Sequence, residues 1–185
     1  INASQYGAAA SHPALGAADY KLALHLPGGR SVYTFCMCPG GTVVAAASEP
    51  DSVVTNGMSY YARDGVNANS ALLVGVGPED FGSEHPLAGM FLQREIERRA
   101  FVLGGRSGKA PCQTVGDLLS GRASGKLGVV EPSYKPGVVP CDLAELLPAP
   151  LIGAMREALP LLGRRLRGFD LPDAVLTGPE TRSSS

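Results

Sequence analysis

The stretch RSVYTFCMCPGGTVVAAAS, from Arg30 to Ser48, carries the clearest signal of the fold. Its two arms are rich in β-branched, aromatic and small apolar residues, and they flank a Pro-Gly-Gly turn at 39–41. Two such runs around a short turn are typical of adjacent antiparallel strands. A second Pro-Gly-Gly turn at 27–29 precedes the stretch, so the pattern predicts a sheet built from successive hairpins.

The neighbouring sequence extends this sheet on both sides. Short runs of strand-forming residues alternate with turns up to residue 76, and one more run lies near the end of the chain. The predicted strands cover residues 20–26, 30–38, 42–48, 52–56, 71–76 and 173–178.

From Leu87 onward the spacing of the apolar residues becomes that of a helix. Apolar residues recur every three or four positions up to Leu103, and the polar triplets at 93–95 and 97–99 fall on the opposite side, which we expect to face solvent. The pair of glycines at 104–105 then ends the helix.

Two further helices are predicted in the second half of the chain. Asp142 and Glu145 have the spacing of a capping box that opens a short helix. A longer helix runs from about 150 to 166, and Pro160 within it should kink it or split it in two. A short helical turn is expected at 115–121.

Strands first, helices next and a final strand predict an α+β fold, in which an antiparallel sheet or small β-barrel carries a helical subdomain. The β-rich portion comprises residues 1–86 and 170–185, and the helical subdomain comprises 87–169. Residues 104–128 are dominated by Gly, Ser and Lys, and we expect them to form a mobile, exposed connection.

Composition excludes several classes of protein. Apolar residues make up 44% of the 185 residues and charged residues 18%, which is globular and not disordered. The net charge of −1 does not favour nucleic acid or an anionic membrane as a partner. No apolar run reaches the roughly 20 residues of a membrane span. The N-terminus has neither a secretory signal nor an initiator Met, so we expect a cytoplasmic protein and a chain cut from a longer one.

Two motifs resemble nucleotide-binding loops but lack a required residue. After a predicted strand, Gly75 and Gly77 begin a dinucleotide fingerprint, but Asp80 stands where the third glycine belongs. The stretch GGRSGKAP at 104–111 is too short for a phosphate-cradling loop and has Ala110 in place of a metal-binding Ser or Thr. The three histidines lack metal-ligand spacing, so no metal site is expected from them.

Cys36 and Cys38 are two positions apart in a predicted strand, so their side chains should share one face. Three interpretations remain open. They are small buried apolar residues, or they form a zinc site with Cys112 and Cys141, or they line a pocket beside a redox-active ligand. Without a secretory signal, all four thiols are expected to be reduced.

The turns beside these cysteines could form the polar rim of a concave site. Glycine allows backbone to approach a ligand closely, and asparagine amides both donate and accept hydrogen bonds. TNGMS at 55–59 reads as a second tight turn. Three ordinary turns between strands explain the same residues equally well. The rim residues are Pro39, Gly40, Gly41, Asn56, Gly57, Met58, Ser59, Asn67 and Asn69.

Four blocks of the sequence resemble a known family. QYG with HPALGAADYKL (5–22), SVYTFCMCPGGTVVAAASEP (31–50) and VVTNGMSYYARDGVNANSALLVG (53–75) are similar to the middle segment of the NAD/FAD-utilising, FAD-dependent dehydrogenases. LTGPETRSSS (176–185) resembles the stretch that returns to their flavin domain. The resemblance covers nearly the whole chain, and its Cys-Met-Cys-Pro-Gly-Gly and Asn-Gly-Met-Ser blocks are specific.

The resemblance implies a role for this segment. In this family the segment is inserted into a dinucleotide-binding domain, caps the flavin and shapes the substrate pocket. FAD would then be held mainly by the flanking domain of the same polypeptide, and this segment alone would be inactive. By resemblance, the turns at 39–41 and 55–59 approach the flavin, as do Glu180 and Thr181, with Cys36, Cys38 and Arg182 as catalytic candidates.

The predicted function is therefore the cap or substrate-binding domain of an FAD-dependent oxidoreductase that acts on a small molecule. The alternative is a noncatalytic domain whose ligand-like loops bind a protein partner. A cap separated from its flavin domain should expose an apolar patch around residues 35–60.

Overall fold

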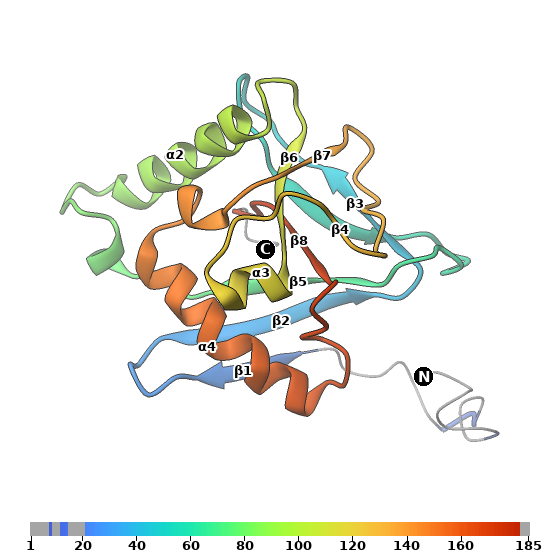
Figure 1. Cartoon of the computed structure of the whole chain (residues 1–185). Coiled ribbons are helices and arrows are strands. Elements are labelled where there is room, and N and C mark those ends of the chain that lie inside the picture. Colours follow the sequence, from blue (N-terminus) through green and yellow to red (C-terminus); the bar gives the residue numbers. More distant parts are fainter. Residues whose placement is uncertain (1–7, 9–11, 15–20, 182–185) are drawn as a thin grey trace.

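The computed structural model describes residue 8, residues 12–14 and residues 21–181 (Figure 1). It confirms a mixed α+β fold, with strands that divide among three small, mostly antiparallel sheets. The strands are β1 (Leu22–His25), β2 (Ser31–Cys38), β3 (Gly41–Ala45), β4 (Thr55–Ser59), β5 (Asn69–Val74), β6 (Ala110–Thr114), β7 (Val138–Pro140) and β8 (Val175–Thr177). The helices are α2 (Ala88–Leu103), α3 (Val115–Ser120) and α4 (Ala149–Arg165), with 3-10 turns η2 (Pro78–Asp80) and η3 (Leu143–Glu145).

The first sheet has the order β1-β2-β5 and is antiparallel throughout. The Pro-Gly-Gly turn at 27–29 joins β1 to β2, as its sequence predicts. Between Phe35 and Cys38 the register with β5 shifts, because Phe35 pairs with Ala71 while Cys38 pairs with Asn69. Three steps along β2 therefore match two along β5, which is a β-bulge at the end of β2.

The other two sheets are smaller. β3 and β4 form an antiparallel pair, in which Val43 lies opposite Gly57. The third sheet has the order β7-β6-β8, where β7 runs parallel and β8 antiparallel to the central β6. The last strand thus returns from the end of the chain to pair with its middle.

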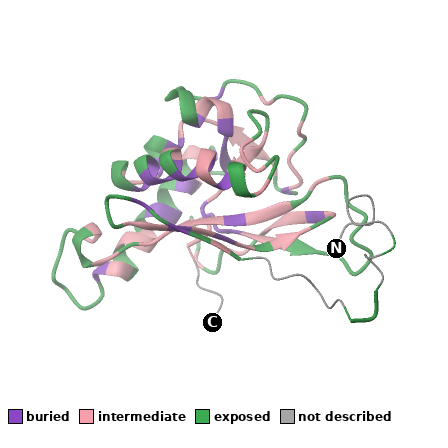
Figure 2. Cartoon of the chain, turned by 90° about the horizontal axis from the view of Figure 1, so that it is seen from below, coloured by how far each residue is buried: buried purple, intermediate pink, exposed green. Residues whose placement is uncertain are grey.

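Helix α4 covers one face of the first sheet and crosses in front of β1 and β2 in Figure 1. Leu24 and Val32 on the sheet pack with Ala158 and Leu162 on the helix in one buried cluster. A larger cluster joins α2, α3, α4 and the third sheet. Burial is concentrated where helices face strands, while the connecting loops at the periphery are exposed (Figure 2).

Residues 104–128 depart from the expected exposed connection. The five residues of β6, from Ala110 to Thr114, are all buried, and α3 follows directly with Val115 and Leu118 buried. β6 is the central strand of its sheet, and all of its residues are buried. The sequence analysis missed it because the strand is short and contains a proline and a cysteine. The segment 87–169 consequently contains strands as well as helices. Within 104–128, the turn at 104–109 and the mostly exposed loop at 121–128 keep the expected loop character.

Two local expectations are also corrected. TNGMS at 55–59 is strand β4 and not a turn, because Gly57 pairs with Val43. Of the two outcomes expected at Pro160, a kink or a split, the split is wrong, because helix α4 runs unbroken from Ala149 to Arg165. Leu159 and Leu162 on either side are fully buried, and their packing offsets the lost backbone hydrogen bond. Among the described residues, no helix is long and apolar enough to cross a membrane.

Candidate functional site

The structure brings together several segments that the sequence analysis had marked at distant positions. Strand β4 links the end of β2 to residues 178–181: Ser59, its last residue, lies beside Cys38, and Thr55, its first residue, contacts Pro179. The Thr55 backbone N–H donates to the Pro179 carbonyl at 2.8 Å, and its hydroxyl donates to the same oxygen at 3.1 Å. Glu180 and Thr181 are thereby fixed beside β4.

Cys38 lies at the β2 end of this junction, beside Ser59. Burial raises the pKa of its thiol, and the neighbouring Cys36 and Glu180 act in the same direction, while a hydrogen bond with Ser59 and the charge of Arg63 oppose them. The thiol donates to the Cys36 carbonyl at 3.2 Å. A thiol with a raised pKa is protonated at neutral pH and is a weak nucleophile.

Cys36 does not follow the alternation expected of a strand. It lies within the β-bulge and has a positive φ of 53°, so the rule that positions i and i+2 share a face does not hold there. Its side chain is exposed, whereas Cys38 is half-buried. The predicted shared face is therefore wrong, although the two cysteines remain neighbours.

The Pro39-Gly40-Gly41 turn packs closely against the loop between β4 and β5. Gly40 has a φ of 57°, and a Cβ there would lie 2.1 Å from the Arg63 carbonyl oxygen. The Gly41 N–H donates to the Asn67 carbonyl at 2.8 Å, and the Asn67 amide donates to the Glu131 carbonyl at 2.7 Å. Gly40 and Asn67 therefore anchor the β4–β5 loop.

Asn69 is the most unusual polar residue of the junction. Its side chain lies against Gly41 and Gly57: a Cβ on Gly41 would be 2.6 Å from Asn69 Nδ2, and one on Gly57 would be 2.4 Å from Asn69 Oδ1. Both amide atoms are buried, and neither has a hydrogen-bond partner. An unsatisfied buried amide is costly, which marks the position as a candidate for a functional role.

The surface beside Cys38 is hollowed. Ser59, Tyr60, Tyr61 and Arg63 line an open depression of about 500 Å³ at the end of β4. Met58 is exposed next to it, while Asn56 is half-buried in the strand. The predicted rim thus falls into two groups: Met58 and Ser59 face the surface, and the glycines with Asn67 and Asn69 lie beneath or beside it.

At the other end of the junction, Thr181 contacts α2. Its hydroxyl donates to the Glu97 carboxylate at 2.6 Å, and the Gln93 amide donates to the same oxygen at 2.9 Å. Glu97 is fully buried, which corrects the expectation that the triplet 97–99 faces solvent. The helical spacing of the apolar residues did not show that Glu97 is buried while the neighbouring Arg98 and Arg99 are exposed. Glu180 is half-buried, and burial raises its pKa. Arg182 lies outside the described residues.

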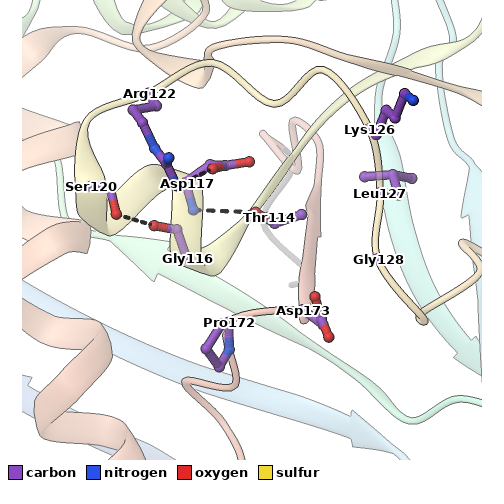
Figure 3. Close-up of a pocket in the computed structure, with 10 residues that line it drawn as sticks. All are labelled: Thr114, Gly116, Asp117, Ser120, Arg122, Lys126, Leu127, Gly128, Pro172 and Asp173. Carbon is purple, nitrogen blue, oxygen red and sulfur yellow. Dashed lines mark hydrogen bonds and ion pairs between the residues drawn. The ribbon is translucent and has the colours of Figure 1, made fainter.

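A second depression, of about 520 Å³, lies at α3 (Figure 3). Asp117 is its central charge, and it accepts hydrogen bonds from Ser124 at 2.7 Å and Arg122 at 2.9 Å. Thr114 caps the helix by accepting from the Asp117 N–H at 3.2 Å. The hydrogen bond from Ser124 is the main cause of the lowered pKa of Asp117. These contacts hold α3 to the following loop and leave the carboxylate already satisfied.

The zinc interpretation of the four cysteines is not supported. Among the described residues, which include all four, no group of three or more His, Cys, Asp or Glu side chains could hold a metal ion. Cys112 and Cys141 are neighbours in the third sheet, where the Cys141 N–H donates to the Cys112 carbonyl at 2.9 Å. Cys112 is buried and Cys141 is half-buried beside the core. Burial raises the pKa of Cys112 to about 12 and that of Cys141 to about 11.

Comparison with known proteins now places this arrangement in a family. Residues 1–183 match the family model described as "FAD-dependent protein, C-terminal domain-like". The chain belongs to this family of FAD-dependent protein C-terminal domains. It is also 52% identical over 186 residues to an uncharacterised protein of Clostridium beijerinckii. That alignment covers all of this chain and 35% of the relative, so the chain spans about a third of the relative's length.

Membership of the FAD-dependent protein family confirms the flavoprotein part of the sequence-based resemblance. The family description supports FAD dependence of the parent protein. The family description does not mention an inserted position, a cap role or a dehydrogenase activity.

Proposed function

We propose that this domain is the cap over the flavin of an FAD-dependent oxidoreductase, where it shapes the pocket for a small-molecule substrate. The observation that supports it best is the junction around Cys38. There the end of β2, strand β4 and residues 178–181, which are far apart in sequence, present Ser59, Arg63 and Glu180 close to one thiol.

The glycine turn at 75–77 does not fit the phosphates of a flavin dinucleotide. At the failed fingerprint, the Gly77 N–H already donates to the Asp80 carboxylate at 2.9 Å, and Asp80 is held by Arg30. A phosphate would have to displace that carboxylate. Dinucleotide phosphates would therefore be held by the flanking part of the polypeptide.

The junction residues could transfer a proton to or from a substrate and could offer it uncharged hydrogen-bonding groups. Glu180, whose pKa burial raises, can retain a proton closer to neutral pH and act as an acid or base toward a substrate. Ser59 offers a hydrogen bond at the surface, and Cys38 lies beside it as a neutral thiol. Arg182, by its position in the sequence, is proposed to stabilise negative charge there. Bound FAD would supply the hydride acceptor.

Expression of the full-length parent and its visible spectrum test the flavoprotein assignment first. Flavin absorption that co-purifies with the protein is the expected result, and a colourless parent would count against the proposal. Once a substrate is found, Glu180→Gln should lower kcat and shift the pH profile while retaining bound flavin. Glu157→Gln, an exposed carboxylate on α4, is the matched control and should leave both unchanged.

A protein-interaction domain without catalytic function is the second candidate. It is favoured by the β4–β5 loop, where Tyr61 and Val66 are fully exposed. The two functions separate in the same experiment, because an interaction domain gives no flavin-dependent turnover and should be unaffected by Glu180→Gln.

A further inference from the structure

Two of the four cysteines share the β-bulge at the end of β2. Cys36 is exposed, and its φ of 53° is a conformation that residues other than glycine rarely adopt. Bulges re-aim side chains and are frequent beside active sites. The packing of the core does not require a cysteine at position 36, because this side chain points to solvent.

The second thiol lies directly against the backbone of the first cysteine. Cys38 Sγ is 3.2 Å from the Cys36 carbonyl oxygen, which is two bonds from the Cα that carries the Cys36 side chain. The two thiols also interact electrostatically. A disulfide between them requires that the Cys36 side chain rotates toward the Cys38 sulfur.

A small molecule can reach this pair from solvent. The open depression of about 500 Å³ that Ser59, Tyr60, Tyr61 and Arg63 line adjoins Cys38, because the Cys38 thiol forms a hydrogen bond with Ser59. Arg63 is exposed, and its side chain forms no ion pair with a carboxylate in the described part of the chain. A free guanidinium at the edge of the depression attracts an anionic ligand.

We propose that Cys36 and Cys38 form a reversible dithiol–disulfide pair, which exchanges with a small disulfide that carries carboxylates, such as oxidised glutathione. The exposed Cys36 attacks the small disulfide first, and the half-buried Cys38 then resolves the mixed disulfide. The exchange needs no flavin, so this inference goes beyond the proposed function and does not depend on it.

The exchange consists of two balanced steps. The Cys36 thiol loses its proton, and its sulfur attacks one sulfur of the small disulfide, whose S–S bond breaks; one half leaves and takes up that proton. The Cys38 sulfur then attacks the Cys36 sulfur, and the second half leaves as a thiol with the Cys38 proton. Two electrons and two protons thus pass from the pair to the small disulfide. Burial raises the pKa of Cys38, but its place beside Cys36 gives it a high effective concentration.

Glutathione redox buffers and peptide mass spectrometry test the pair in the full-length parent. The native protein is incubated with mixtures of reduced and oxidised glutathione, quenched with acid, alkylated and digested with trypsin. Cleavage after Arg30 and Arg63 gives a peptide that contains Cys36 and Cys38 and neither of the other two thiols. The expected product is this peptide without alkylation and lighter by two hydrogen atoms, and excess reduced glutathione should reverse it.

The chain supplies its own control pair. Cys112 and Cys141 are also neighbours, since the Cys141 N–H donates to the Cys112 carbonyl at 2.9 Å, but Cys112 is buried. We expect this pair to stay reduced in the native protein at glutathione ratios that oxidise the first pair. Oxidation of both pairs only at the same ratios would overturn the proposal.

Two variants separate the roles of the thiols. Cys38→Ser should trap the mixed disulfide, so its glutathione adduct on Cys36 should be at least about tenfold more abundant than in the wild type. Cys36→Ser should give little of either product. An adduct on Cys36 that accumulates in the wild type without the lighter peptide would overturn the proposal, because the two sulfur atoms then do not meet.

A third variant tests the preference for carboxylates. Arg63→Gln should slow the reaction with oxidised glutathione roughly threefold and leave the reaction with the uncharged hydroxyethyl disulfide unchanged. Equal rates of wild type and variant with oxidised glutathione would refute the anionic specificity. A colourless parent that forms the disulfide would support the pair while the flavin assignment fails, and a yellow parent that never forms it would do the reverse.

Discussion

The hydroxyl of Thr181 donates a 2.6 Å hydrogen bond to the carboxylate of Glu97, which lies 84 positions earlier and is 1% exposed. This bond joins the last described residue to helix α2. Together with the two hydrogen bonds from Thr55 to Pro179, it fixes the path of residues 179–181. The position of Glu180 at the candidate site depends on these contacts.

Thr181→Val should destabilise the domain by about 1 to 2 kcal/mol, because it removes one hydrogen bond to a buried carboxylate. Gln93 still donates to Glu97 in this variant, so the carboxylate keeps a partner. Urea unfolding measures the loss. Ser120→Ala, which removes an exposed hydroxyl on α3, is the control and should cost less. Equal losses in the two variants would show that the contact with Glu97 contributes nothing specific.

Gly57→Ala should destabilise the domain by about 1 to 3 kcal/mol, since its Cβ would be 2.4 Å from Asn69 Oδ1. The loss should shrink when Asn69 is also changed to alanine, and a double-mutant cycle measures that coupling. Gly153→Ala, at an exposed position of α4 with open space around it, should instead raise stability by up to about 1 kcal/mol. The same loss for Gly57→Ala in both backgrounds would contradict the contact.

The ion pair between Arg30 and Asp80 should contribute to acid sensitivity. The hydrogen bond from Arg30 is the main cause of the lowered pKa of Asp80, so the folded state releases this proton more readily than the unfolded state. Its stabilisation is present above the ordinary aspartate pKa of about 3.9 and is lost as the pH falls through the lower folded value. Asp80→Asn should therefore flatten the pH dependence of the unfolding free energy on the acid side. Exposed Asp51→Asn should leave that slope unchanged, and a similar flattening there would refute the assignment.

Three of the four thiols, Cys36, Cys38 and Cys112, should react in a defined order with maleimide. Cys36 is exposed and should label first; Cys38 should follow slowly, because it is half-buried and its pKa is raised. Cys112, buried and with a pKa raised to about 12, should label only after unfolding. Mass spectrometry of the labelled peptides gives the order, and Cys36→Ser should remove the fast phase. Labelling of Cys112 at the rate of Cys36 in the native protein would mean that the third sheet is open.

The 185-residue chain by itself should not bind FAD at micromolar affinity. It offers no phosphate-cradling loop among its described residues, since the Gly77 N–H is already bound by Asp80. Calorimetric titration with FAD tests this, with the full-length parent as the positive control. Micromolar binding by the segment would mean that it holds a flavin site of its own, and the cap assignment would have to be abandoned.

Local patterns were sufficient to predict many of the elements. The Pro-Gly-Gly turn and the alternating run before it predicted β2, and the three-to-four spacing after Leu87 predicted α2 almost to its ends. These signals succeed because turn residues and apolar period act within a few positions of the chain. Asp142 likewise caps η3, accepting a hydrogen bond from the Ala144 N–H.

The candidate site was predicted only in part. Sequence blocks marked the turn at 39–41, strand β4 and residues 180–181 as related, and the structure places them around Cys38 and Thr55. The sequence could not show that Gly40 and Gly41 make room for the β4–β5 loop and for Asn69, because the atoms that need the space are 23 to 28 residues away.

The sequence by itself determined the α+β class, the positions of the hairpin turns and the absence of a phosphate loop at Gly75 and Gly77, since each depends on residues that are near neighbours in the chain. Tertiary structure alone decided that β6 is a buried central strand and that Glu97 is buried against Thr181. Both depend on segments that meet only in the folded protein. Whether a residue is buried depends on the segments that pack over it, and these can be distant in sequence. A charged residue or a stretch with a proline therefore gives no local indication that it will be buried.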